Sequence, residues 1–264
     1  CAGPSARTDA PPAAGNTGLP ASSPQMATAS TLPGYLAPGA FDIMTVLPPA
    51  PRAGEARYEH DRRVFRDTRA LEGSPRWLMA ASDAELSNTA LLQHFSCSLG
   101  IELKPEQAPR LMTLLQRVSR DTSSSVGTAK DYYKRQRPFW IDAGNTCRPR
   151  EELGQSFDYP SGHTTAGWTW ALVLTQVAPD HATALLARGR SYGESRIVCG
   201  VHNASAVEGG RLTATAVVTV AAATADYQHD LVAARTELAS LRHGTHNDPA
   251  PARCATEVAL EKIP

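Results

Sequence analysis

Apolar residues recur at helical intervals along most of this 264-residue chain, and no stretch shows the sustained alternation of apolar and polar positions typical of half-buried strands. In residues 105–125, for example, Leu111, Leu114, Leu115 and Val118 fall on one helical face. The pattern therefore predicts an all-α fold. Further helices are predicted from about Glu55 to Leu71 and in residues 82–100, 129–138, 161–179 and 202–241.

Some of these predicted helices carry signals at their ends. Ser82 is a residue type that caps helix N-termini, and Gly100 is one that ends helices. Within residues 129–138, Lys130 and Arg137 lie seven positions apart, which is two helical turns. Both cationic side chains are therefore expected on the same face of a helix.

The beginning of the chain lacks this helical pattern and is rich in Pro, Ala, Ser and Thr, a composition typical of disordered segments. We interpret residues 1–34 as a linker and residues 35–264 as a single helical domain. The chain starts with Cys1, as bacterial lipoproteins do after removal of a signal peptide, so Cys1 is expected to carry lipid. The alternative is an ordinary cysteine at a cloning boundary.

Composition narrows the class of ligand. The chain has 26 Lys and Arg residues and 26 Asp and Glu residues, so no excess of positive charge indicates a nucleic acid partner. The longest apolar run, Leu212–Ala225, is shorter than the roughly 20 residues that a membrane-spanning helix needs. We therefore expect a small ligand, and contact with a membrane only through a lipid anchor.

The cysteines predict disulfide bonds. Besides Cys1 the chain contains four, an even number that in an exported protein indicates two disulfides, with three possible pairings. Cys254 is expected to fix the C-terminal tail in place. The four residues are Cys97, Cys147, Cys199 and Cys254.

Three short motifs carry chemistry that suits one anion. Lys130 and Arg137 are the first, and the sequence PSGH at residues 160–163 is the second, because free backbone N–H groups at a helix start bind anions. The third is SRIVCGVH, in which Arg196 suits phosphate oxygens and His202 suits a base, a ligand or a nucleophile. Taken alone, the first motif is more typical of a solvated helix end, and the second is equally typical of a capped helix. The Arg and His of the third would more often be structural.

Together and in this order, K-x6-R-P, P-S-G-H and S-R-x5-H resemble the signature of the phosphatidic acid phosphatase type 2 (PAP2) superfamily. The stretches DAELS, YYKRQRPF, YPSGHTTAGWTWALVL and SRIVCGVH are similar to bacterial class A non-specific acid phosphatases, over roughly residues 35–240. This resemblance implies the helical fold shared by acid phosphatases and haloperoxidases. It also implies hydrolysis of phosphate monoesters, such as nucleotides, sugar phosphates and aryl phosphates, with inorganic phosphate as a product.

The resemblance further implies which residues hold the substrate. Lys130, Arg137 and Arg196 would neutralise the oxygens of the phosphoryl group during in-line transfer, assisted by the Ser161 hydroxyl and the Gly162 amide. Three cationic side chains would then replace a divalent ion. Neither a metal nor another cofactor is expected, and no cluster of Asp and His has persuasive metal-ligand spacing.

Two histidines would perform the chemistry implied by the resemblance. His202 would be the nucleophile that forms a phosphohistidine, and His163 the general acid that protonates the leaving alkoxide. The sequence gives little indication of which residues contact the leaving group of the substrate. The candidates are three aromatic residues, Trp140, Phe157 and Tyr159.

One position departs from the family pattern, which ends H-x3-D. This chain has Ala206 four residues after His202, where a carboxylate would accept the histidine Nδ1–H and fix the tautomer. By analogy with the Ser-His-Asp triad, its loss predicts a rate lower by about 10⁴. Glu208 is a poor substitute, because it points elsewhere on a helix. An engineered Asp-to-Ala change is favoured over a natural variant, because the other motif residues are intact.

Two other functions remain open at this point. One is a vanadium-dependent haloperoxidase, which holds vanadate in a pocket of the same shape, and the other is a lipid-anchored phosphate-binding protein without catalysis. The resemblance and Cys1 together indicate the bacterial periplasm, with a lipid anchor in a membrane that is more typically the outer one. A homodimer or larger assembly is also expected from the resemblance.

Overall fold

The computed structural model of this protein describes residues 32–154, 156–244 and 247–263. These residues form helices and loops and contain no strand, which confirms the all-α prediction. The expected linker lies almost entirely outside the described residues, as does Cys1. The α-helices are α1 (Ile43–Val46), α2 (Ala56–Thr68), α3 (Pro75–Ser82), α4 (Asn88–Leu99), α5 (Pro109–Tyr133), α6 (Gly162–Val177), α7 (Ala182–Val198), α8 (Ala204–Ala222), α9 (Ala225–Gly244) and α10 (Pro251–Leu260).

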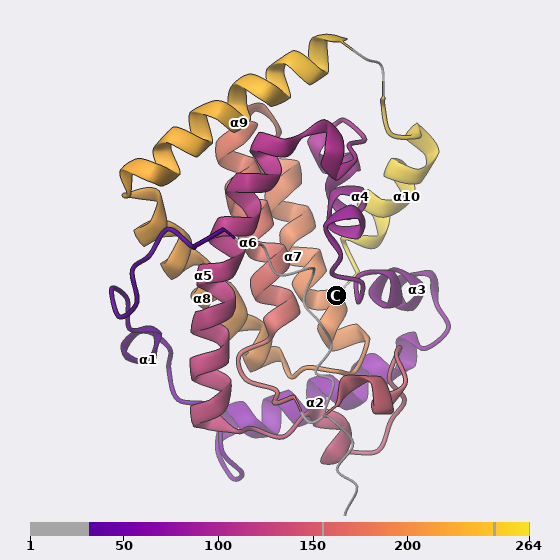
Figure 1. Cartoon of the computed structure of the whole chain (residues 1–264). Helices are drawn as coiled ribbons and strands as arrows, with labels where there is room; N and C mark the ends of the chain where they lie inside the picture. Colours follow the sequence, from indigo (N-terminus) through magenta and orange to yellow (C-terminus); the bar gives the residue numbers. More distant parts are fainter. Residues whose placement is uncertain (1–31, 155, 245–246, 264) are drawn as a thin grey trace, which may run out of the picture.

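Helix α6 is the central element of the bundle (Figure 1). It packs against α5, α7 and α8, and α9 crosses α5 at one end of the bundle. Helix α2 crosses the opposite end, where it contacts α7 and α8. Helices α3 and α4 pack on α7, and α10 packs on both of them. Within the described ranges, no helix is both long enough and apolar enough to cross a membrane.

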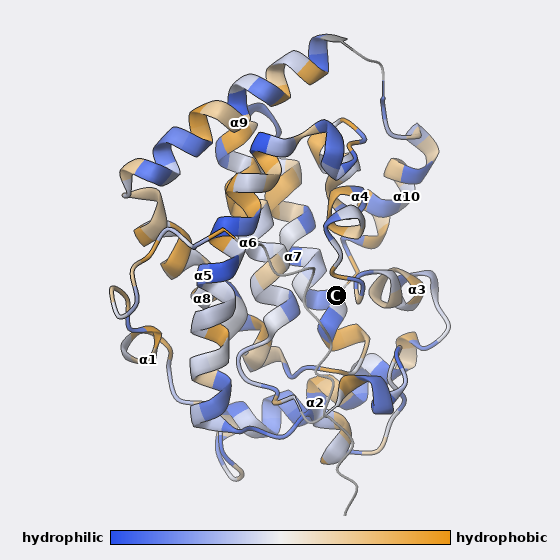
Figure 2. Ribbon diagram, in the orientation of Figure 1, coloured by the Kyte–Doolittle hydropathy of each residue, from blue (hydrophilic) through white to orange (hydrophobic). Residues whose placement is uncertain are grey.

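The main hydrophobic core lies between helices α4 to α9. The predicted apolar face of α5 belongs to it, since Leu111, Leu114, Leu115 and Val118 are all fully buried. Helix α6 contributes Trp170, which is 2% exposed, and is apolar on most sides, as expected of a helix surrounded by others. Figure 2 shows the apolar residues gathered in the upper part of the central helices, whereas α2 is largely hydrophilic.

Helices α6 and α7 approach each other closely through glycines. A Cβ atom on Gly189 would lie 2.4 Å from the Ala171 Cβ, and one on Gly193 would lie 2.8 Å from the Thr164 Cγ2. Only a residue without a side chain permits this spacing. The close contact fixes the C-terminal half of α7, which carries Arg196, against the first turns of α6.

The observed helix in residues 82–100 differs from the prediction at its start and agrees with it at its end. Ser82 ends α3 and does not cap a helix, while α4 begins after Ser87, whose side chain accepts a hydrogen bond from the Ala90 N–H. Gly100 ends α4 in the left-handed conformation, with φ 77°, which confirms its predicted role. Helix α3 itself, which Ser74 caps, was not predicted.

Helix α7 was also not predicted, and its composition explains why. Its buried face consists largely of polar and small residues, so the sequence shows little apolar periodicity there. Arg188 in this face is 2% exposed and forms an ion pair with Asp83, at 2.5 Å between Nη2 and Oδ1. The Ser195 hydroxyl donates to the same carboxylate at 2.6 Å. Long-range polar contacts replace the apolar stripe that sequence patterns detect.

Two further predictions about helices were wrong. Residues 109–133 form one continuous helix, α5, which ends where Lys134 adopts a left-handed conformation with φ 45°. Arg137 therefore lies beyond α5 and does not share a helical face with Lys130. The predicted helix 202–241 is divided into α8 and α9 by a turn in which the Thr224 hydroxyl accepts the Tyr227 N–H.

Both predicted disulfides are present, and the structure selects one of the three pairings. Cys97 of α4 bonds to Cys254 of α10, which fixes the C-terminal tail as expected. Cys147 bonds to Cys199, directly after α7, and the Cys147 N–H also donates to the Cys199 carbonyl at 2.9 Å. The second disulfide therefore connects the loop after Arg137 to the segment that precedes His202.

Candidate active site

The three sequence motifs lie at the same end of the bundle, the end that α2 crosses (Figure 1). The first motif occupies the C-terminal end of α5 and the loop that follows it in the chain. The second motif occupies the N-terminal end of α6. The third occupies the C-terminal end of α7 and the short connection to α8. Helix direction alone therefore brings together residues that are far apart in the sequence.

Two of the three predicted cations are held by backbone carbonyls of one loop. The Arg137 Nε donates to the Ser156 carbonyl at 2.7 Å, and its Nη1 donates to the Val201 carbonyl at 2.8 Å. The Lys130 ammonium donates to the Phe157 carbonyl. Both residues of the first motif therefore donate to backbone carbonyls of loop 156–158, although Arg137 lies beyond the end of α5.

The third cation, Arg196, is 1% exposed and donates from Nη2 to the Ala80 carbonyl. Its Nε is buried without any hydrogen-bond partner. Within the described ranges, Arg196 forms no ion pair with a carboxylate, and neither do Lys130 and Arg137, whereas the equally buried Arg188 does. Arg137 and Arg196 are buried and Lys130 is half-buried, and the carboxylate of Asp158 raises the pKa of Lys130 and Arg137 without forming an ion pair with either. Three such cations close together make a site that favours an anion.

The electrostatic effect of this arrangement appears in the pKa values of the three groups. Burial, together with the Arg137 guanidinium, lowers the pKa of Lys130 to about 7. Burial and the charge of Arg196 lower the pKa of Arg137 to about 10. The pKa of Arg196 is also lowered, again chiefly by burial. Each cation is thus destabilised by the site, and a bound anion would relieve this.

Ser161, Gly162 and His163 lie at the start of α6, where the sequence predicted an anion cradle. Ser161 caps the helix, and its hydroxyl oxygen accepts from the Thr164 N–H at 3.3 Å and from the Thr164 hydroxyl at 2.9 Å. With its oxygen accepting two bonds, the Ser161 hydroxyl still has its own proton to donate. A Cβ atom on Gly162 would meet only Val126, at an ordinary 3.8 Å, so protein packing does not require glycine there.

His163 lies in the first turn of α6, and its ring is oriented by a neighbouring segment. Its Nε2–H donates to the Ala84 carbonyl at 3.0 Å. Among the described contacts, Nδ1 has no protein partner. Burial and the Arg196 guanidinium hold the pKa of His163 well below its usual range, so the imidazole is neutral in the absence of an anion.

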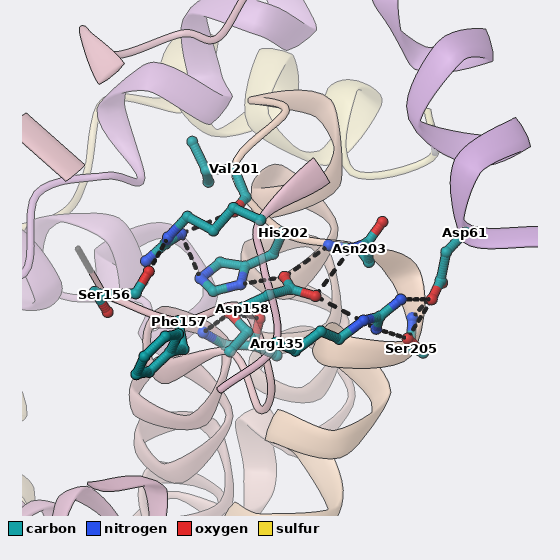
Figure 3. Close-up of polar contacts among 12 residues, drawn as sticks. Asp61, Arg135, Ser156, Phe157, Asp158, Val201, His202, Asn203 and Ser205 are labelled. Carbon is teal, nitrogen blue, oxygen red and sulfur yellow. Dashed lines mark hydrogen bonds and ion pairs between the residues drawn. The ribbon is translucent and has the colours of Figure 1, made fainter. Parts of the chain in front are cut away.

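His202 is held at both ring nitrogens, as Figure 3 shows. Nδ1 donates to the Asp158 Oδ1 at 3.0 Å, and Nε2 accepts from the Arg137 Nη1 at 3.1 Å. This pair of contacts fixes the tautomer with the proton on Nδ1 and the lone pair on Nε2. Burial and the charges of Arg137 and Lys130 hold the pKa of His202 well below its usual range. The Nε2 lone pair therefore lies beside the cations, and it can act as a nucleophile once a bound anion accepts the Arg137 N–H in its place.

Sequence reasoning missed Asp158. The family pattern places the carboxylate four residues after His202. Asp158 instead precedes the PSGH motif and contacts the imidazole from another segment of the chain. The sequence contains one weak signal, because the stretch FDYPSGH places an acidic residue between two aromatic residues directly before the motif. Nothing local indicates its partner.

The remaining candidate residues occupy two kinds of environment. Ala206 is fully buried in the first turn of α8, in an apolar cluster that includes Tyr159. Tyr159 is itself fully buried and donates to the Pro48 carbonyl at 2.8 Å, so it packs in the core and does not line a substrate site. Trp140 is 61% exposed and Glu208 is exposed on the outer face of α8.

The described ranges contain no group of three or more His, Cys, Asp or Glu residues that could hold a metal ion.

Comparison with known proteins gives this site a family. The PAP2 superfamily profile matches residues 112–230, which include every predicted catalytic and phosphate-binding residue. The "Acid phosphatase" of Zymomonas mobilis subsp. mobilis is 39% identical over 208 residues, 78% of each chain. The "Non-specific acid phosphatase" of Providencia stuartii is 32% identical over 206 residues, which are 77% of this chain and 83% of that protein. The protein of the same name from Salmonella typhimurium is 38% identical over 168 residues, which are 62% of this chain and 67% of that protein. The chain therefore belongs to the PAP2 superfamily, and within it to the family of these acid phosphatases.

Proposed function

We propose that this protein is an acid phosphatase that hydrolyses small phosphate monoesters through a phosphohistidine on His202. The observation that carries the proposal is the set of three cations beside His202, none of which forms an ion pair among the described residues. A phosphoryl group carries its negative charge on the oxygens around phosphorus, and Lys130, Arg137 and Arg196 would neutralise it while the phosphorus faces Nε2.

The reaction has two balanced steps. In the first, the His202 Nε2 lone pair forms the P–N bond while the P–O bond to the ester oxygen breaks, and His163 gives its proton to the leaving alkoxide. In the second, His163 takes a proton from water, the oxygen of that water forms a bond to phosphorus, and the P–N bond breaks. Inorganic phosphate leaves and both histidines return to their initial states.

His163 must be protonated to act in the first step, although its pKa is low in the empty site. The lowering comes from burial and from the positive charge of Arg196, both of which favour the neutral ring. A phosphate dianion among the three cations offsets that charge, so substrate binding raises the pKa of His163. We therefore expect catalysis to be favoured at mildly acidic pH.

Replacement of the two histidines tests the proposal. His202→Ala should abolish both turnover of p-nitrophenyl phosphate at pH 5 to 6 and the phosphoenzyme trapped by an alkaline quench, because no P–N bond forms. His163→Ala should slow β-glycerophosphate, which has a poor leaving group, far more than p-nitrophenyl phosphate, which needs little protonation.

The matched control is His229→Ala, since His229 is exposed on α9 and outside the site. Full turnover by His202→Ala would contradict the phosphohistidine mechanism. Equal losses on the two substrates for His163→Ala would contradict its role as general acid. Oxidation of bromide with added vanadate would support a haloperoxidase, and phosphate binding without any turnover would support a binding protein.

Location and assembly belong to the same proposal. Two disulfides suit an oxidising compartment such as the periplasm. A lipid on Cys1, which precedes the described residues, would attach the enzyme to a membrane, and a homodimer or larger assembly is expected from the family. Mass spectrometry of the protein extracted from membranes tests the lipid, and light scattering tests the assembly.

A further inference from the structure

The family carboxylate missing at residue 206 has a counterpart elsewhere in this chain. Asp158 comes from the loop before α6, and its Oδ1 lies 3.0 Å from the Nδ1 of His202 (Figure 3). The partners are 44 residues apart in the sequence, and both are almost fully buried, with Asp158 at 0% and His202 at 2% exposure. Water therefore does not compete for this contact.

The carboxylate of Asp158 is itself held by several donors. Its Oδ1 also accepts the Asn203 N–H at 3.1 Å, and its Oδ2 accepts the Asn203 Nδ2–H at 2.9 Å. The Arg135 Nη1 lies 3.3 Å from Oδ2, and the Asp158 N–H donates to the Arg135 carbonyl at 2.8 Å. Such a set of donors holds the carboxylate in a single orientation.

A second aspartate holds Arg135 from the other side. The Arg135 Nη2 donates to the Asp61 Oδ2 at 2.7 Å, and the Asp61 Oδ1 accepts the Ser205 N–H at 2.9 Å. The backbone N–H groups at the start of α8 are thus satisfied by carboxylates from other segments, where negative charge is favoured. Helix α2 and the loop before α6 are therefore both connected to the His202 segment.

Position 206, by contrast, is built into an apolar environment. The Ala206 side chain is fully buried in a cluster with Ile43, Leu47 and Tyr159, and its carbonyl accepts the Ser161 N–H at 2.9 Å. An aspartate placed there would bury a negative charge among apolar neighbours, and the Tyr159 hydroxyl already donates to the Pro48 carbonyl.

We propose that Asp158 is the positioning residue of His202 and takes the place of the carboxylate that the family pattern has four residues after the nucleophile. This chain is then an active enzyme with Ala206 as its natural residue. This inference rests on the proposed function, because it assigns how the nucleophile is prepared. The predicted loss of rate rests on residue 206 being the position from which a carboxylate contacts the His202 Nδ1. In the structure Asp158 makes this contact, so the loss is no longer expected. Asp158 holds the proton on Nδ1 and stabilises the positive charge that develops on the ring as the P–N bond forms.

Substitutions at the two positions separate the possible outcomes. Asp158→Asn should lower kcat for p-nitrophenyl phosphate by about 10³ to 10⁴, because an amide that donates to Nδ1 selects the wrong tautomer. The Ki of inorganic phosphate should stay within about threefold, since the three cations are untouched. Ala206→Asp alone should give no gain, and Asp158→Ala with Ala206→Asp should recover part of the turnover that Asp158→Ala loses.

The matched control is Asp131→Asn, since Asp131 is exposed on α5. Thermal unfolding of each variant identifies any loss that is due to misfolding. The proposal is overturned if Asp158→Asn turns over within about threefold of the unsubstituted enzyme, or if Ala206→Asp alone raises kcat a hundredfold.

A spectroscopic measurement tests Asp158 independently of turnover. The ¹⁵N shifts of the His202 ring in the unsubstituted protein should show the proton on Nδ1, and this signature should be lost in Asp158→Asn. Mixed tautomers in the unsubstituted protein would contradict the inference even if the enzyme is active. If no phosphate ester is hydrolysed at all, the proposed function fails, and the ring shifts still decide whether Asp158 fixes the tautomer.

Discussion

Lys130 is the cation of the site whose charge depends most on pH near neutrality. Its amine is buried beside Arg137, and its pKa is lowered to about 7. A guanidinium at the same position would remain charged throughout this range. At the residue scale, we therefore expect Lys130 to set the upper pH limit for binding phosphate.

Replacement by arginine tests this limit. As pH rises through 7, the unsubstituted enzyme loses the Lys130 proton, and its Ki for inorganic phosphate should rise about tenfold by pH 8 relative to the Ki of Lys130→Arg. The ionisation of phosphate itself cancels in this ratio. Lys134→Arg, at an exposed position, is the control and should follow the unsubstituted enzyme. The same rise in Ki for all three proteins would show that Lys130 does not set the limit.

Only part of the residue-scale chemistry could be predicted from the sequence. The cations, Ser161 and the two histidines belong to short motifs, and their proximity follows once the helices pack. Asp158 could not be assigned, because no rule of helix or turn spacing connects it to His202 across 44 residues. The pKa values also depend on burial, which arises only in the folded chain.

At the scale of elements, the contact between α8 and the PSGH loop positions the site. A Cβ atom on Gly210 would lie 2.7 Å from the Ser161 carbonyl oxygen, which is backbone and cannot rotate away. A Cβ atom on Gly127, also within a helix, would meet nothing within 4 Å. These two glycines therefore differ in what an added methyl group should do.

Gly210→Ala should separate α8 from the PSGH loop, and both the free energy of unfolding and kcat should fall. Gly127→Ala should stabilise the protein by about 0.5 to 1 kcal/mol, because alanine favours helix and no neighbour is displaced. Urea unfolding and turnover of p-nitrophenyl phosphate measure the two effects. Equal stabilisation by both substitutions would show that the loop adapts to the extra methyl group.

Helix prediction succeeded where packing is apolar and failed where it is polar. The face of α5 and the end of α4 at Gly100 follow from local spacing and local conformational preference. Helix α7 was not predicted, because its buried Arg188 and Ser195 form hydrogen bonds with Asp83, which lies more than 100 residues away in the sequence. The end of α5 before Arg137 depends on Lys134 adopting a left-handed conformation, which the residue type did not indicate.

At the scale of the whole molecule, the two disulfides connect different parts of the structure. Cys97–Cys254 joins α4 to α10 at the side of the bundle, whereas Cys147–Cys199 joins the loop after Arg137 to the segment that carries His202. The first therefore supports global stability, and the second also supports the geometry of the site.

Removal of each pair should separate these effects. Cys97→Ala with Cys254→Ala should cost about 2 to 5 kcal/mol of unfolding free energy with little change in kcat. Cys147→Ala with Cys199→Ala should lower stability and also kcat, because Arg137 and His202 lose a shared constraint. Denaturant unfolding and steady-state kinetics on both variants provide the measurements. Loss of kcat in the first variant at a temperature where it is fully folded would contradict this division.

The sequence by itself determined the helical class, and its short motifs, through their family resemblance, predicted the three cations and the two histidines of the site. These depend on residue type and on neighbours within a few positions, which fix helix periodicity, capping and charge. The tertiary structure decided which cysteines pair, where α7 lies and which carboxylate holds His202. Those outcomes are set by the packing of distant segments, and for that reason Asp158, and not residue 206, lies at the nucleophile.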